Sequence, residues 1–162
     1  MPVVKELQEL LDKQNIKYVA ISHSLAYTAQ ETAELAHVSG KEMAKTVIMK
    51  IDGALAMAVL PGSCLIDVSA LKSAIGAQTV EVAREPEFSD RFPGCETGAM
   101  PPFGNLYGMP VFVDQSLTKD KEIAFNAGTH NELIRLSYAD FELLVKPTVL
   151  NFASRRAGIS AA

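Results

Sequence analysis

The sequence predicts a mixed α/β domain, in which a largely antiparallel or mixed β-sheet is surrounded by helices. Asp52-Gly53 separates two apolar segments, and this dipeptide is the most typical marker of a tight β-hairpin. Segments with helical periodicity alternate with several further segments rich in β-branched and aromatic residues. Neither a βαβ glycine fingerprint nor a P-loop is present, so a nucleotide-cofactor fold is not supported.

The N-terminal elements follow from apolar spacing and capping patterns. Residues 3–14 carry leucines at helical spacing, and residues 17–21 form a short strand. Thr28-Ala-Gln-Glu31 matches a capping box, which predicts a second helix that ends near Val38. The hairpin strands then begin at Ala44 and end at Pro61.

The remaining elements are shorter. Asp67 caps a helix that Gly76 ends, and Asp67, Asp114 and Asp140 are interpreted as structural carboxylates at turns or helix caps. The further expected helices and strands are a strand at 78–82, a short helix at 85–91, strands at 109–113, 122–126 and 132–137, and a helix at 138–145. We expect one domain over residues 1–152, with a flexible tail at 153–162.

Composition narrows the class of protein. The chain has 162 residues, of which 48% are hydrophobic, enough to form a core without metals or disulfides. Its net charge is −4, and no apolar run of about 18 residues indicates a membrane span. Cys64 and Cys95 do not form a disulfide framework, so reduced thiols in a cytoplasmic protein are expected. The three histidines are far apart and have no cysteine at ligand spacing, so no metal site is predicted.

Three segments carry candidate chemistry. The segment GAMPPFG, residues 98–104, encloses two prolines between glycines, which describes a loop of specified backbone shape. Lys45 begins an apolar strand, where it is either a solvated end residue or a charge presented to a phosphate or an oxyanion. His130, in Ala-Gly-Thr-His, is either a surface turn residue or a group that orients a substrate. Cys95 with His130 as its base is a further alternative.

Together, Ala44-Lys45-Thr46, Gly98-Ala-Met-Pro-Pro102-Phe-Gly104 and Ala127-Gly-Thr-His130 resemble the YbaK/ProX family. Members are freestanding aminoacyl-tRNA deacylases related to the editing domain of bacterial prolyl-tRNA synthetases. The resemblance extends from about residue 1 to Pro147. It implies a curled, barrel-like mixed sheet with helices around it. It also implies hydrolysis in trans of the ester between an amino acid and the terminal ribose of a mischarged tRNA.

The resemblance also implies the site. The family's lysine matches Lys45 and holds the terminal adenosine or its phosphate, while backbone amides of the GxxxP loop lie near the aminoacyl carbonyl. Fixed backbone donors of this kind can stabilise the oxyanion of ester cleavage, without cofactor or metal. The expected catalytic positions are Lys45, Gly98, Ala99, Met100, Pro101 and Pro102. The expected substrate-binding positions are Thr46, Phe103, Gly104, Gly128 and His130.

The substrate is expected to be a small amino acid carried by tRNA(Pro). The 3′ acceptor end of this aminoacyl-tRNA is expected to bind at the site. The family branch that clears alanine has an asparagine after the lysine, where this chain has Thr46. Alanine, serine, threonine and small non-protein amino acids therefore all stay open. Prolyl-tRNA synthetase or other translation factors are candidate partners, and neither DNA nor a membrane is expected. A non-catalytic module that binds aminoacyl-tRNA or a synthetase is the alternative function.

Overall fold

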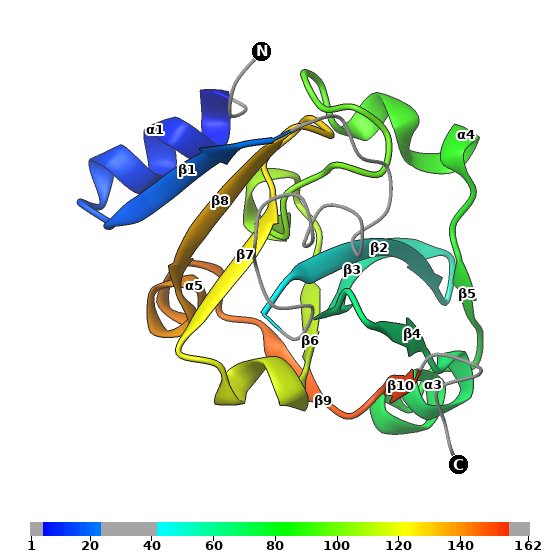
Figure 1. The fold of residues 1–162 in the computed structure, drawn as a ribbon. Helices are drawn as coiled ribbons and strands as arrows, with labels where there is room; N and C mark the ends of the chain where they lie inside the picture. Colours follow the sequence, from blue (N-terminus) through cyan, green and yellow to red (C-terminus); the bar gives the residue numbers. More distant parts are fainter. Residues whose placement is uncertain (1–4, 24–41, 156–162) are drawn as a thin grey trace.

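A computed structural model describes residues 5–23 and 42–155 of the chain (Figure 1). The predicted helix at 28–38 lies outside the described residues. The described helices are α1 (Lys5–Lys13), α3 (Val68–Ile75), α4 (Glu85–Phe88) and α5 (Tyr138–Val145), with 3-10 turns η1 (Ser89–Arg91), η2 (Gly104–Leu106) and η3 (Gln115–Lys119). The strands are β1 (Tyr18–Ser22), β2 (Ala44–Ile51), β3 (Ala54–Pro61), β4 (Cys64–Ile66), β5 (Val80–Val82), β6 (Val111–Asp114), β7 (Glu122–Asn126), β8 (Glu132–Ser137), β9 (Thr148–Leu150) and β10 (Ala153–Arg155).

The strands form a mixed α/β fold, as predicted. A five-stranded sheet has the order β5-β2-β3-β6-β9, in which β3–β6 and β6–β9 are parallel and the other pairs are antiparallel. An antiparallel three-stranded sheet has the order β1-β8-β7, and β10 pairs with β4 in a small third sheet. No continuous ladder closes these sheets into a barrel among the strands of residues 5–23 and 42–155.

A backbone bridge joins the two larger sheets. Met43, just before β2, forms a parallel bridge with Ala124 in β7, and the amide of Ala124 donates to the carbonyl of Glu42 across 2.9 Å. The main core contains apolar side chains of both sheets, including Ile48 from β2 and Phe125 from β7. The bridge therefore fixes the start of β2 beside β7 at the edge of a shared core.

Local sequence signals explain most of the observed elements. The β2–β3 hairpin turns at Asp52-Gly53, where both residues have positive φ, as the tight hairpin requires. Asp67 caps α3 by accepting a hydrogen bond from the Ala70 amide, and Gly76 ends this helix with a left-handed φ of 78°. Asp140 lies in the first turn of α5, where its amide donates to the capping hydroxyl of Ser137.

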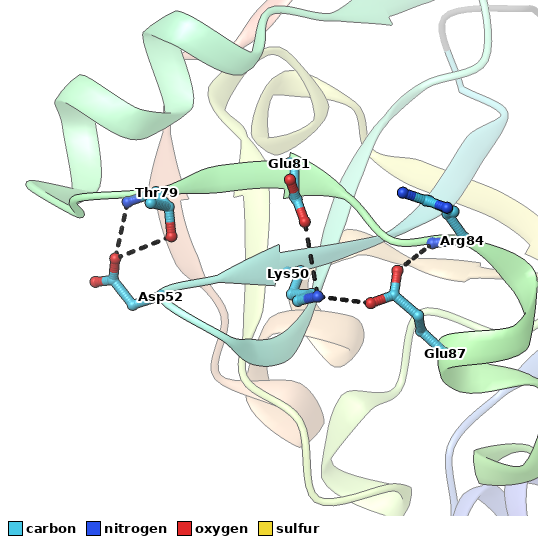
Figure 2. A network of polar contacts seen from close by, with 6 residues as sticks. All are labelled: Lys50, Asp52, Thr79, Glu81, Arg84 and Glu87. Carbon is cyan, nitrogen blue, oxygen red and sulfur yellow. Dashed lines mark hydrogen bonds and ion pairs between the residues drawn. The ribbon is translucent and has the colours of Figure 1, made fainter.

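A polar network holds β5 and α4 against the hairpin (Figure 2). The Nζ of Lys50 lies 2.7 Å from Oε2 of Glu87 and 3.7 Å from Oε1 of Glu81. The hydrogen bond from the Arg84 amide, together with Lys50, lowers the pKa of Glu87, and the hydrogen bond with Glu87 raises the pKa of Lys50. Oδ1 of Asp52 accepts hydrogen bonds from the Gln78 and Thr79 amides at the other end of β5. The segment that leads toward the GAMPPFG loop is therefore anchored on both sides.

The C-terminal part differs from the prediction. Ala153–Arg155, assigned to the flexible tail by sequence, form β10 and pair with β4. Asp114 explains why the chain is ordered here, since its Oδ1 accepts hydrogen bonds of 2.8 Å from the amides of Phe152 and Ala153. Burial alone would raise the pKa of Asp114, but these bonds and those from Ser116 hold it below its usual value. No helix in the described part of the chain is both long and apolar enough to cross a membrane.

Candidate active site

The GAMPPFG loop is anchored by its C-terminal half. The Phe103 ring is fully buried, with its centroid 5.5 Å from that of Phe125 and 5.6 Å from that of Phe141. A Cβ at Gly104 would overlap the Met109 carbonyl oxygen and lie 2.6 Å from Cγ2 of Val111. Phe103 and Gly104, predicted as substrate-binding residues, therefore lie in the core and hold the loop in place.

The N-terminal half of the loop begins with a tight turn. The amide of Ala99 donates to the carbonyl of Glu96 across 3.0 Å, which closes a four-residue turn. Gly98 is the third residue of this turn and has a φ of 87°, the value that a type II turn requires at this position. Gly98 is exposed, whereas Ala99 and Met100 are buried. The turn therefore presents the Gly98 backbone at the surface.

The Ala127–His130 segment braces this turn through reciprocal hydrogen bonds. The Gly128 amide donates to the Ala99 carbonyl across 2.9 Å, and the Glu96 amide donates to the Gly128 carbonyl across 2.7 Å. The His130 amide in turn donates to Oε1 of Glu96 across 2.7 Å. The structure thus brings together two of the three motifs that the sequence singles out.

The His130 side chain also contacts the turn. Its Nε2 lies 2.7 Å from the Thr97 carbonyl oxygen, and since a carbonyl only accepts, Nε2 carries the hydrogen in this contact. The ring is buried, and a Cβ at Gly98 would lie 3.4 Å from His130 Cε1. The buried ring of His130 therefore packs against the turn at Thr97 and Gly98, and His130 is a positioning residue in this arrangement.

Few backbone amides of the loop remain for a ligand. Pro101 and Pro102 have no N–H, and the N–H of Ala99 already closes the turn. The Gly98 N–H contacts only Sδ of Met100, at 3.2 Å, and sulfur is a weak acceptor. In the described part of the chain, the N–H of Met100 has no hydrogen-bond acceptor. Within residues 98–102, the amides of Gly98 and Met100 are therefore the two that remain to donate to an ester carbonyl.

Lys45 and Thr46 project from opposite faces of β2. Thr46 pairs with Val59, whose side chain belongs to the main core, while Lys45 pairs with Leu60, which packs in a separate cluster with Met49. Both residues are half-buried. Ala44 shares the main core with Met100 and Phe103, so β2 is packed on the same core as the loop.

Cys95 lies in an environment that disfavours the reactive thiolate. Its Sγ is 3.5 Å from the Tyr107 hydroxyl, and burial raises the pKa of the thiol. Burial also raises the pKa of Tyr107, so no base is supplied by this partner. Because the thiolate is the nucleophilic form, this geometry argues against the Cys95 nucleophile.

Sequence reasoning missed two residues near the site. Glu96 connects the loop turn to the His130 amide, and Asn126 ends β7 with a buried Oδ1 that has no hydrogen-bond partner among the described residues. Neither lies in a motif, and only the folded chain shows these positions. Within residues 5–23 and 42–155, no cluster of three or more His, Cys, Asp or Glu side chains could hold a metal ion.

Comparison with known proteins places this geometry in a family. A profile of the aminoacyl-tRNA editing domain matches residues 23–144, a range that contains Lys45, the loop and His130. The Escherichia coli (strain K12) multifunctional Ser/Thr-tRNA deacylase ProXp-y is 28% identical over 153 residues, which cover 91% of each chain.

Solved structures share the fold. The hypothetical protein APE2540 aligns with a TM-score of 0.82 and 22% identity, over 93% of this chain and 100% of that one. A protein described as a candidate trans-editing enzyme for prolyl-tRNA synthetase aligns with a TM-score of 0.78 and 20% identity, over 93% of this chain and 96% of that one. The resemblance that the three motifs carry is confirmed: the chain belongs to the aminoacyl-tRNA editing domain family.

Proposed function

We propose that this chain is a trans-editing aminoacyl-tRNA deacylase, which hydrolyses the ester of a mischarged tRNA that carries a small amino acid. The observation that carries this proposal is the braced turn at residues 96–99. Reciprocal hydrogen bonds with Gly128 fix the turn, and they leave the N–H groups of Gly98 and Met100 for a ligand. The family match over residues 23–144 supports the same activity.

The proposed chemistry is oxyanion stabilisation. Ester hydrolysis passes through a tetrahedral intermediate, and preorganised amides that point at its oxygen lower the barrier. The amides of Gly98 and Met100 would donate to this oxygen, while Pro101 and Pro102 keep the backbone from rearranging. The attacking group is a water held at the loop or a hydroxyl of the substrate itself.

Lys45 is proposed to bind the terminal adenosine, through its phosphate or a neighbouring oxygen. The side chain is half-buried at the start of β2, so it presents a fixed positive charge at the edge of the sheet. A single local charge suits a protein of net charge −4, because only the tip of the tRNA needs to be held. We also propose that the two larger sheets act as one curled, barrel-like sheet, joined at Met43 and Ala124, that supports this edge.

The proposed substrate is a small amino acid on tRNA(Pro), which the cytoplasm would supply. Prolyl-tRNA synthetase is the proposed partner, because it would release the mischarged product. The curated relative is named for serine and threonine, and this favours a hydroxyl-bearing amino acid among the alternatives that the sequence leaves open.

The test is a deacylation screen with tRNA charged with alanine, serine, threonine, cysteine and 2-aminobutyrate. Purified protein should release at least one of these amino acids, and Lys45→Ala should remove most of this activity. Lys72→Ala is the matched control, since Lys72 is exposed on α3 and should leave the rate unchanged. If charged tRNA binds to the wild-type protein but every ester stays intact, the chain is a binding module instead.

A further inference from the structure

Asn126 has a buried polar atom that no group of the described chain satisfies. It is the last residue of β7, and its Oδ1 is inaccessible to solvent and has no hydrogen-bond partner among the described residues. Nearly all buried polar side-chain atoms in folded proteins are hydrogen-bonded, so each exception asks for an explanation. A ligand that supplies the missing partner is one such explanation.

Asn126 lies on the same face of the fold as Lys45. It pairs with Leu133 on β8, and Leu133 packs with Met43 and Ala124 in a small cluster separate from the main core. Met43 and Ala124 form the parallel bridge between β2 and β7. Lys45 lies two residues after Met43, and Asn126 lies two residues after Ala124. Residues two apart in a strand face the same side, so Lys45 faces the side of Met43 and Asn126 faces the side of Ala124. The strands therefore place Lys45 and Asn126 each two residues beyond the bridge, on the side that faces away from the main core.

We propose that the side-chain amide of Asn126 recognises the side-chain hydroxyl of the amino acid to be removed. This inference rests on the proposed deacylase function. The amide has both an acceptor and a donor, and a serine or threonine hydroxyl is likewise a donor and an acceptor. A substrate with this hydroxyl satisfies the buried Oδ1, whereas an isosteric substrate without it leaves the atom unpaired.

The hydroxyl is distinguished from the other donors of an aminoacyl-adenosine end. The α-ammonium group and the ribose hydroxyls are present in every substrate, so contacts with them would affect all amino acids equally. A contact with the side-chain hydroxyl gives selectivity between serine and alanine, or between threonine and 2-aminobutyrate. A site built to bind a hydroxyl rejects the analogue that lacks it far more strongly than an apolar site rejects a methyl difference.

The experiment compares wild-type protein with Asn126→Leu, which keeps the branched outline and the number of side-chain heavy atoms but has no polar atom. We expect kcat/KM for seryl- and threonyl-tRNA to fall on the order of tenfold, the effect of one hydrogen bond, and kcat/KM for alanyl- and 2-aminobutyryl-tRNA to change less than about twofold. Because no internal hydrogen bond of Oδ1 is lost, Tm should not fall. Asn151→Leu, at an exposed position between β9 and β10, is the matched control and should leave all four rates unchanged.

The outcomes separate the two proposals. An active wild-type protein whose Asn126→Leu variant loses the same factor on all four substrates overturns the hydroxyl assignment alone. A marked fall in Tm would show that Asn126 supports the fold, and this also overturns the assignment. A wild-type protein without activity on any charged tRNA overturns the deacylase function itself, and the assignment with it.

Discussion

His130 and Thr97 are joined by a hydrogen bond of 2.7 Å from Nε2–H of the imidazole to the carbonyl oxygen of the turn. The Thr97 carbonyl belongs to the peptide unit that also contains the Gly98 N–H, so this bond fixes the plane of that peptide. His130 therefore orients one of the two amides proposed to bind the ester oxygen. Its role is expressed through the loop and does not require proton transfer.

Substitutions of His130 should distinguish the effect of its N–H donor from the effect of its side-chain volume. His130→Phe keeps a ring of similar size but removes the donor, and we expect kcat to fall about tenfold, since one hydrogen bond contributes roughly 0.5–1.5 kcal/mol. His130→Gln keeps an N–H donor at similar reach and should recover most of the rate. Single-turnover deacylation with saturating enzyme measures this difference. A Phe variant as fast as the wild-type protein would show that the bond to Thr97 is dispensable.

Gly98 and Ala99 are adjacent but should respond differently to substitution. Gly98→Ala introduces a Cβ at a φ of 87°, which costs about 1–2 kcal/mol in backbone strain and rotates the amide that faces the ester. We expect a large decrease in kcat and only a modest decrease in Tm. Ala99 is fully buried, so Ala99→Leu overpacks the core by about 1–3 kcal/mol and should mainly lower Tm.

Deacylation rates and thermal unfolding of both variants measure these effects. Ala99→Ser, which changes the side-chain volume only slightly, is the control for Ala99→Leu. If Gly98→Ala keeps the wild-type rate, the exposed backbone of the turn is only a connection between elements.

The sequence predicts the longer elements well for a physical reason. β7, β8 and α5 are found at the predicted residues, because apolar periodicity and the Ser137 cap are local signals. β4, β9 and β10 have three residues each, and so short a segment shows no period. They form because neighbouring strands pair with them, which is tertiary information.

The candidate site likewise combines features that local sequence signals predict with features that only the tertiary structure shows. The loop glycines and prolines are visible in the sequence because they specify backbone shape. The brace from Gly128 is made by main-chain groups of a residue whose φ of 112° favours glycine. The sequence marks this glycine, but it does not show that its amide and carbonyl pair with Ala99 and Glu96. The buried Oδ1 of Asn126 likewise depends on how β7 lies against β2 and β8.

Asp114 should make the stability of the C-terminal strands dependent on pH. Its pKa is held below the ordinary value in the folded state by hydrogen bonds from Ser116, Phe152 and Ala153, despite the opposing effect of burial. A depressed folded-state pKa contributes stability that is present above the unfolded pKa of about 3.9 and is lost as the pH falls through the folded value. The free energy of unfolding should therefore decrease below about pH 4 partly because of this group.

Asp114→Asn keeps the shape of the side chain, but it removes the negative charge and replaces one of the two accepting oxygens with an NH2 group. At pH 7 we expect the variant to lose about 1–3 kcal/mol in the free energy of unfolding, with the first loss of amide protection in Phe152 and Ala153. The difference from the wild-type protein should shrink as the pH falls below 4, because the wild-type carboxylate becomes protonated. Denaturant unfolding at several pH values, with hydrogen exchange at pH 7, measures both effects. A difference that stays constant down to pH 2 would mean that the charge of Asp114 does not stabilise this end of the fold.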